Sequence, residues 1–193
     1  QPKDIREDNE QAAGIRPFST NPSPELPRGF SAAGFAGGVK GPVKSGAKEE
    51  KLDMALIYSE SPATAAGVFT KNSVRADCVD WNRSRIERGG SFRAICANSG
   101  NANACTGARG AEDSKTLARS VSRLLSIDEE EVLLASTGVI GVPLPIERMA
   151  AALEKRKHPP KTDCLEDAAR AIMTTDTVPK VAGTSFRLGG KEG

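Results

Sequence analysis

The chain of 193 residues is long enough for one domain with a hydrophobic core, and its 38% hydrophobic and 27% charged residues are typical of soluble globular proteins. Its 27 basic residues nearly balance its 25 acidic residues, so the composition favours neither nucleic acid nor an acidic membrane as a partner. No apolar run approaches the roughly 18 residues of a membrane-spanning helix, and the polar stretch Gln1–Glu10 predicts neither a signal peptide nor a transit sequence.

The N-terminal region, residues 1–28, is expected to be an extended strap or a mobile tail, because prolines interrupt it and it has little hydrophobic periodicity. We expect the folded domain to span residues 29–193. A glycine-rich stretch from Gly34 to Gly46 contains the first spacing of a Walker phosphate loop. Ala47 occupies the position of the essential lysine, however, so a hairpin or a surface loop is the better interpretation.

Hydrophobic patterning predicts a mixture of strands and helices. Short apolar runs predict strands over Asp53–Ser59, Thr64–Thr70, Phe92–Ala97, Val132–Leu134 and Ser185–Leu188. Apolar residues at helical spacing predict helices over Ala111–Ser126, from Ile146 onward, and over Thr162–Met173 with Asp163 as its N-cap. The basic stretch Arg83–Arg93 is interpreted as a solvated loop. Because no regular βαβ rhythm is present, we predict an α/β (α+β) fold, a layered sandwich of mixed sheets and helices that is not a Rossmann fold.

The cysteine and histidine content narrows the available chemistry. The four cysteines form no C-x-x-C pair and match no zinc-binding spacing, which favours free thiols in a cytoplasmic protein; they are Cys78, Cys96, Cys105 and Cys164. The single histidine, His158, lies in a charged segment broken by prolines. We therefore expect no Ser-His-Asp triad and no metal site, so an enzyme built on this chain needs a nucleophile activated in another way or supplied by another chain.

Three polar segments interrupt the pattern, and each lies at the end of an apolar element: Asn98–Gly107, Ser136–Gly141 and Thr174–Lys180. The first is rich in asparagine and glycine, whose amides and positive-φ positions suit a binding loop. The third combines three threonines with a carboxylate and a lysine, which could hold an amino-acid-like ligand. Each segment alone is also explained as a loop or a helix exit, but a cleft on a rigid scaffold gathers such segments at element ends.

The segment Ser136–Gly141 connects a predicted strand to a predicted helix. Backbone N–H groups in such a turn lack partners, and its two glycines let a ligand approach, so the segment could stabilise an anion or an oxyanion. The alternative is a plain connector whose glycines serve tight turning. Taken alone, the local sequence favours the connector.

These segments resemble the ornithine acetyltransferases, the glutamate N-acetyltransferase family of arginine biosynthesis (the ArgJ family). The resembling motifs are Asn98–Gly107, Ser136–Pro145, Ala171–Lys180, Gly29–Gly34 and Ala63–Thr70. Several motifs in the order of the family make this resemblance far more specific than a lone glycine motif.

The resemblance implies that the chain is most of the N-terminal α piece of a precursor that cleaves itself between an Ala and a Thr. The β chain then begins with the nucleophilic Thr, whose own α-amine can act as the base. The β chain would also complete the core and share the active site, in an α2β2 heterotetramer or a higher oligomer. The sequence ends at Gly193 without the Lys-Gly-Ser/Ala-Gly-Met segment of the family, so the family's substrate lysine has no number here.

The same resemblance assigns roles to three residues. Thr137 and Gly138 would form the oxyanion hole, and Thr174 would contact the amino-acid substrate. No catalytic role transfers to the Asn98 segment, which we expect to shape the cleft or to hold the loop around Thr137. The implied reaction moves an acetyl group from N-acetylornithine to glutamate through an acetyl-threonine intermediate, in the cytoplasm and without a metal or cofactor. Acetyl-CoA stays open as a second acetyl donor, which would make the enzyme bifunctional.

Two other classes of function remain as alternatives. A related self-processing hydrolase or aminopeptidase would resolve the acyl-enzyme with water, and the match at Thr174-Thr175-Asp176 favours the transferase over it. A non-catalytic ligand-binding module is the second alternative, because the chain itself holds no nucleophile.

Overall fold

A four-stranded mixed sheet forms the centre of the protein, in a computed structural model that describes residues 25–41, 51–160, 165–183, 187–188 and 191–192. The strands, in their order across the sheet, are β1 (Phe30–Phe35), β2 (Met54–Ala63), β3 (Phe92–Asn101) and β4 (Val132–Val139). Neighbouring strands β1, β2 and β3 pair antiparallel, whereas β4 runs parallel to β3. The predicted α+β class is confirmed, and this strand order is not that of a Rossmann fold.

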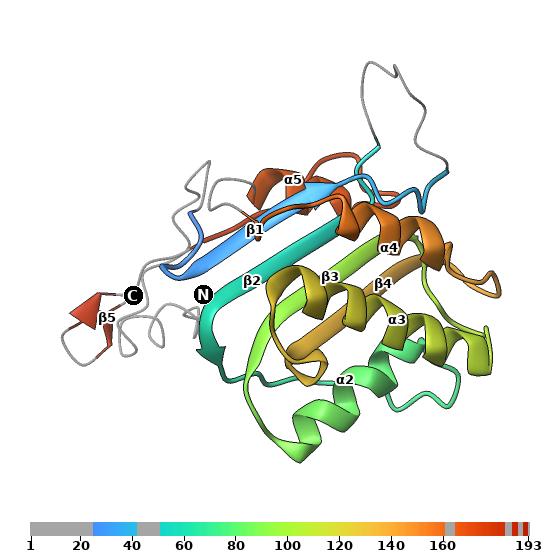
Figure 1. Ribbon diagram of the computed structural model, residues 1–193, viewed down its shortest axis with the longest axis horizontal. Helices are drawn as coiled ribbons and strands as arrows, with labels where there is room; N and C mark the ends of the chain where they lie inside the picture. The colour runs from blue at the N-terminus through green and yellow to red at the C-terminus, as the bar shows by residue number, and fades with distance from the viewer. Residues whose placement is uncertain (1–24, 42–50, 161–164, 184–186, 189–190, 193) are drawn as a thin grey trace, which may run out of the picture.

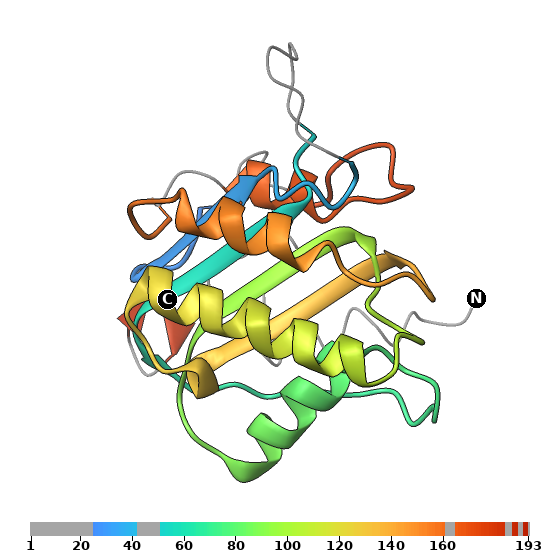
Figure 2. The same ribbon diagram turned by 45° about the vertical axis from the view of Figure 1, so that its right-hand side comes forward.

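Helices cover the two faces of the sheet unequally (Figures 1 and 2). One face carries α2 (Asp77–Arg88), α3 (Ala108–Leu125) and α4 (Ile146–Glu154). The opposite face carries α5 (Leu165–Ala171), which packs against β1 and β2. The short 3-10 helix η1 (Glu129–Glu131) leads into β4, and a separate two-stranded ladder joins β5 (Arg187–Leu188) to β6 (Lys191–Glu192).

The main hydrophobic core lies between the sheet and helices α2, α3 and α4. Side chains alternate between faces along a strand, and one set points into this core: Phe35, Met54, Leu56, Cys96, Val132 and Leu134. The helices contribute apolar residues at helical spacing, among them Leu117, Val121, Leu125, Met149 and Leu153. Strands β3 and β4, which carry two of the three polar segments, are therefore held from one side by a buried apolar layer.

The opposite face of the sheet is packed with small residues where it meets α5. The contact joins Ala32, Ala55, Ala168 and Ala171. A Cβ atom at Gly34 would lie 2.0 Å from the backbone oxygen of Asp167, so glycine is required for the helix to approach this closely. The cover by α5 reaches the end of β3 at Ala97 and Ser99, whereas Ile95 of β3 remains 40% exposed.

Most predicted elements are confirmed with shifted ends. The strands predicted from Asp53, Phe92 and Val132 are β2, β3 and β4, and the three predicted helices are α3, α4 and α5. The last predicted strand is confirmed at Arg187–Leu188, while its first residues and the predicted N-cap Asp163 lie outside the described residues.

The prediction of a solvated loop over Arg83–Arg93 is wrong. Residues up to Arg88 belong to α2, and Phe92 begins β3. Helix α2 buries only a narrow stripe, so charged residues dominate its sequence and conceal the helical period.

The prediction of a strand over Thr64–Thr70 is also wrong. These residues follow β2 without regular structure, and the side chain of Val68 is fully exposed. Strand propensity has no effect where no neighbouring strand is available for pairing.

The glycine-rich stretch from Gly34 to Gly46 is predicted to be a hairpin or a surface loop. Its first two residues instead end β1, residues 36–41 form a loop, and the rest lies outside the described residues. The predicted tail over residues 1–28 lies outside the described residues except for 25–28. Among the helices that the structure describes, none combines the length and the apolar character needed to cross a bilayer.

Candidate functional site

The three polar segments meet at one end of the sheet. Because β3 and β4 are parallel, their carboxyl ends lie at the same end of the sheet. There Ser99 pairs with Thr137 and Gly100 with Gly138. The end of α5 reaches this end of the sheet as well, since the Ser99 hydroxyl donates a hydrogen bond to the backbone oxygen of Ala171. The following segment is bonded at Met173 by Lys40, whose side chain lies next to Gly100. The structure thus gathers in one place the segments that the sequence separates widely.

Thr137 and Gly138 belong to strand β4 itself. The prediction that a turn begins at Ser136 is wrong, because the strand continues to Val139 by pairing with the last residues of β3. Leu134 points into the main core, so the alternation of side chains directs Thr137 to the opposite face of the sheet, where it is exposed.

Helix α2 covers the first half of the outer edge of β4. The Asn82 carboxamide donates to the backbone oxygen of Leu134 at 2.7 Å and accepts from its backbone nitrogen at 2.9 Å. The Trp81 indole N–H donates to the backbone oxygen of Val132 at 2.8 Å. Gly138 lies beyond the residues that α2 bonds, where the pairing of β4 with β3 becomes irregular.

The backbone of Gly100 and Asn101 occupies the space where a Cβ atom at Gly138 would lie. Gly138 has a φ of 136°, and a Cβ atom there would lie 2.3 Å from the carbonyl carbon of Gly100 and 2.4 Å from the backbone nitrogen of Asn101. Any side chain at position 138 would therefore collide with backbone. With no side chain there, the exposed Gly138 backbone lies beside the exposed Thr137, and the two offer hydrogen-bond donors of the kind that stabilises an oxyanion.

Buried asparagines hold the chain around these donors. The Asn98 side chain accepts from the Ser136 hydroxyl at 2.7 Å and donates to the backbone oxygen of Asn101 at 2.8 Å. The Asn101 side chain donates in turn to the backbone oxygen of Val142 at 3.0 Å, across the turn that follows β4. Buried amides with satisfied partners fix the groups that they bond. These bonds confirm the expectation that the Asn98 segment holds the loop around Thr137.

Thr174 lies at the same end of the sheet. It follows α5 by three residues and is exposed, whereas Ala171 at the end of the helix is buried. The Lys40 ammonium donates to the backbone oxygen of Met173 at 2.8 Å, directly before Thr174. The segment that carries Thr174 is therefore anchored twice, at Ala171 by Ser99 and at Met173 by Lys40.

The charged pair in this third segment is satisfied internally. Lys180 forms an ion pair with Asp176, and its hydrogen bond holds the pKa of the Asp176 carboxyl below its ordinary value. Both residues are exposed. The carboxylate and the ammonium that we expected to hold a ligand thus pair with each other in this structure.

Asp53 and Lys40 are two charged residues near the candidate site that the sequence alone does not identify. The Asp53 carboxylate is 1% exposed, and it accepts hydrogen bonds from the backbone N–H groups of Gly37 and Lys40. These bonds tie the loop after β1 to the start of β2, next to the last residues of β3. The sequence separates Lys40 and Asp53 by a glycine-rich stretch, and neither belongs to a spacing that predicts chemistry.

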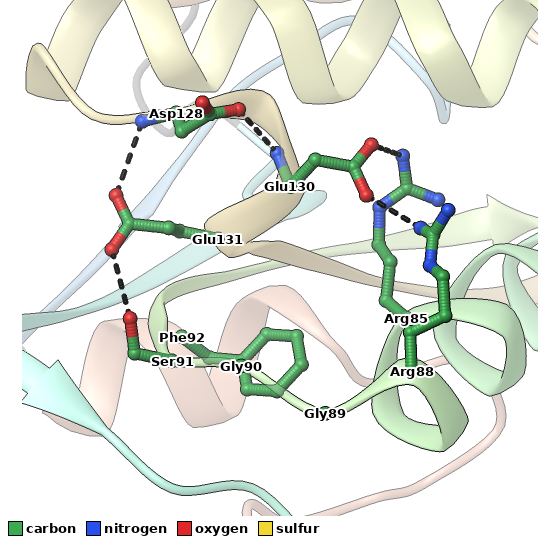
Figure 3. A pocket seen from close by; sticks show the side chains of 9 residues that line it. All are labelled: Arg85, Arg88, Gly89, Gly90, Ser91, Phe92, Asp128, Glu130 and Glu131. Carbon is green, nitrogen blue, oxygen red and sulfur yellow. Dashed lines mark hydrogen bonds and ion pairs between the residues drawn. The ribbon is translucent and has the colours of Figure 1, made fainter.

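A second polar cluster lies at the opposite end of the sheet, where a pocket of about 270 Å³ opens between the last turn of α2 and η1 (Figure 3). Arg85 and Arg88 both donate to the Glu130 carboxylate, and Asp128 and Glu131 form the reciprocal capping box of η1. These charged groups are paired within the protein, so the cluster connects α2 to the start of β4 and is not our candidate site.

Among the residues that the structure describes, the remaining reactive side chains do not form a site. His158 is exposed beyond the end of α4. Burial raises the pKa of the Cys96 thiol to about 12, which keeps it neutral and unreactive. Within the described part of the chain, no three His, Cys, Asp or Glu side chains are placed to hold a metal ion.

Comparison with known sequences identifies close relatives. A sequence model of the ArgJ family matches residues 39–193. The "Arginine biosynthesis bifunctional protein ArgJ" of Caldanaerobacter subterraneus subsp. tengcongensis is 46% identical over 168 residues, which cover 87% of this chain and 40% of the relative. The protein of the same name from Gloeobacter violaceus is 45% identical over 164 residues, which cover 85% and 39%. The chain therefore spans about two fifths of the length of these curated relatives.

Two solved structures are also similar. The crystal structure of the arginine biosynthesis bifunctional protein ArgJ from Bacillus halodurans has a TM-score of 0.73 and 34% identity, covering 86% of this chain and 82% of that chain. The structure of ornithine acetyltransferase complexed with ornithine from Mycobacterium tuberculosis has a TM-score of 0.66 and 38% identity, covering 79% of each chain.

Proposed function

The chain belongs to the ArgJ family, and from that premise we propose that it is the α chain of a self-cleaved acetyltransferase of arginine biosynthesis. In this proposal the enzyme transfers an acetyl group from N-acetylornithine to glutamate in the cytoplasm. One observation carries the proposal: the three polar segments, which are among the five that resemble the family, meet at one end of the sheet around the exposed Thr137 and Gly138.

Thr137 and Gly138 suit an oxyanion hole by position and by rigidity. Thr137 and Gly138 are both exposed at the end of β4, where its pairing with β3 becomes irregular. The paired strands and the buried Asn98 fix both donors before a substrate arrives. Donors that need no reorganisation contribute most to catalysis, and loss of one typically costs about 3 kcal/mol of barrier.

In the proposed reaction, the N-terminal Thr of the β chain attacks the acetyl carbonyl of N-acetylornithine. Its α-amine takes the hydroxyl proton and passes it to the leaving amine, so ornithine departs and acetyl-threonine remains. The amine of glutamate then attacks this ester, the threonine hydroxyl regains its proton, and N-acetylglutamate leaves. Thr137 and Gly138 stabilise the oxyanion in both steps, while Thr174 contacts the amino-acid part of the substrate.

The coverage of the relatives supports a precursor that is cut into two chains. This chain covers about 40% of the curated relatives but 82% and 79% of the two solved chains, which are thus much shorter than the curated proteins. Apolar side chains are exposed near the proposed site, with Val139 58% and Ile140 62% exposed. We propose that the β chain covers these residues and the open face of β3 and β4, in an α2β2 or higher oligomer.

The source of the acetyl group has a second candidate. The curated relatives carry the word "bifunctional" in their names, which supports a second activity beside transfer from N-acetylornithine. We propose acetyl-CoA as the donor for that activity. A hydrolase that releases acetate is the main alternative, and it is distinguished by its product.

The test is Thr137→Ala in the full-length precursor, assayed with N-acetylornithine and glutamate. We expect N-acetylglutamate formation to fall by roughly 100-fold or more while the two chains still assemble. Thr116→Ala is the matched control, because Thr116 lies on α3 away from the sheet end. Unchanged transfer in Thr137→Ala would overturn the oxyanion assignment, and release of acetate without transfer to glutamate would favour the hydrolase.

A further inference from the structure

Lys40 connects three segments that are far apart in the sequence. Its ammonium donates to the backbone oxygens of Met173 at 2.8 Å and Leu52 at 3.2 Å. Its backbone N–H donates to the Asp53 carboxylate at 2.9 Å. One residue thus links the loop after β1, the start of β2 and the segment after α5.

The stem of Lys40 contacts the strand pair that carries the proposed oxyanion hole. A Cβ atom at Gly100 would lie 2.9 Å from Cγ of Lys40, so the methylene chain packs directly on Gly100. Gly100 is opposite Gly138 in the register of β3 and β4. Lys40 therefore contacts the strand beside Gly138 with its stem and the residue before Thr174 with its ammonium.

The environment of the ammonium indicates a specific role rather than solvation. Burial lowers the pKa of Lys40, and the nearby Asp53 carboxylate partly compensates by favouring the charged form. Ordering a lysine side chain also costs conformational entropy, which a surface lysine avoids. Two carbonyl acceptors from separate segments offset these costs, because hydrogen bonds to charged groups are stronger than those between neutral groups.

We propose that Lys40 is a positioning residue, which holds the Thr174 segment in register with Thr137 and Gly138. This inference rests on the proposed function, in which Thr174 contacts the amino-acid substrate. Because Met173 immediately precedes Thr174, a hydrogen bond to the Met173 carbonyl limits the positions that Thr174 can take. Ser99 supplies the second anchor, at Ala171.

The kinetic test uses Lys40→Met in the full-length precursor, because Met keeps the stem length and removes the ammonium. We expect the KM for N-acetylornithine to rise about tenfold, the effect of one charge-assisted hydrogen bond, with kcat changed much less. Lys115→Met is the matched control, an exposed lysine on α3. A fall in kcat with unchanged KM would overturn the positioning role.

A double-mutant cycle tests whether Lys40 acts through Thr174. In a Thr174→Ala background, where the substrate contact is already lost, Lys40→Met should raise KM no further. A second tenfold increase in that background would show that Lys40 acts independently and would refute the inference. Should Lys40→Met fail to assemble, Ser99→Ala removes the other anchor and carries the same expectation for KM.

A measurement without activity separates this inference from the proposed function. In the intact protein, Lys40→Met should speed amide hydrogen exchange over residues 172–176 relative to Lys115→Met, because it releases the anchored carbonyl. Unchanged exchange there would overturn the positioning role even if the enzyme transfers acetyl groups. Conversely, if Lys40→Met speeds exchange in a protein that does not transfer acetyl groups to glutamate, that result would support the positioning role of Lys40 and reject the proposed reaction.

Discussion

Gly138→Ala is the substitution that the geometry of β4 predicts most sharply. Gly138 has a φ of 136°, a backbone conformation that L-residues rarely adopt. Its new Cβ would meet the backbone of Gly100 and Asn101 at 2.3 and 2.4 Å. Backbone atoms of a paired strand cannot rotate away as a side chain can, so β3 and β4 have to separate at this point.

The expected cost has two parts. The positive φ contributes about 1–2 kcal/mol for a residue with a Cβ, and forced repacking contributes a further 1–3 kcal/mol or so. Gly141→Ala provides a matched comparison, because Gly141 also has a positive φ, 74°, but open space around its Cβ position. Gly141→Ala should therefore show only the conformational part, about 1 kcal/mol.

The assay is thermal unfolding of the intact protein, followed by circular dichroism for both variants and the parent. The difference of about 2 kcal/mol between the variants corresponds to roughly 4–8 °C in the unfolding temperature for a chain of this size. Gly138→Ala should also lower acetyl transfer, since the displaced strand moves the proposed donor. Equal unfolding temperatures for the two variants would refute the collision of a Cβ atom at position 138 with the backbone of β3.

Two further substitutions are tested by unfolding of the intact protein. One removes a contact at the outer edge of β4, and the other removes a buried carboxylate on α3. Asn82→Ala removes both hydrogen bonds to Leu134 and should cost about 2 kcal/mol, and an effect below the error of measurement would contradict the role of α2 at the edge of β4. Asp113→Asn should stabilise the protein at pH 7, because burial raises the pKa of Asp113, Oδ2 has no hydrogen-bond partner among the described residues, and its ion pair with Arg109 is long, at 3.8 Å. A raised folded pKa means that the stability contribution of protonated Asp113 is present below its ordinary pKa of 3.8 in the unfolded chain and is lost as the pH rises through the folded pKa. The advantage of Asp113→Asn should therefore vanish below about pH 4, and a constant advantage at all pH values would contradict this explanation.

The sequence predicts those elements whose burial leaves a clear hydrophobic period. Helix α3 is an example, since Leu117, Val121 and Leu125 recur at helical spacing and all face the main core. Strands β2, β3 and β4 are likewise found from their apolar runs. Their ends are harder to place, because β4 continues through Thr137 and Gly138 by pairing with β3 rather than by burying side chains.

Elements that pack through small or charged residues escape this kind of prediction. Strand β1 consists mostly of small residues, because α5 approaches so closely that Gly34 has no room for a side chain. Helix α2 is rich in charge, and its Trp81 and Asn82 bond to the β4 backbone, while few of its residues pack against the main core. Neither arrangement produces a periodic signal, so tertiary contacts determine both elements.

In the candidate site, too, some residues can be identified from the sequence and others cannot. Its motif-bearing residues, Thr137, Gly138 and Thr174, are identified from a resemblance between whole segments. The residues that bring these segments together, Lys40 and Ser99, act by bonding to backbone carbonyls of a distant segment. A hydrogen bond to a carbonyl requires no particular residue at the acceptor, so no pattern in the sequence marks the pair.

The side chains of α2 that bond to β4 have a consequence for assembly. An unprotected outer strand invites any extended peptide to add to the sheet, which is a common route to aggregation. Trp81 and Asn82 occupy the backbone groups of Val132 and Leu134, so no foreign strand can add along that length. The Ser136 backbone still faces the Cys78 thiol of α2, and past it the backbone of Gly138 is exposed among the residues that the structure describes. Helix α2 thus prevents strand addition along the first half of β4. It leaves the backbone directly beside Thr137 accessible to another chain.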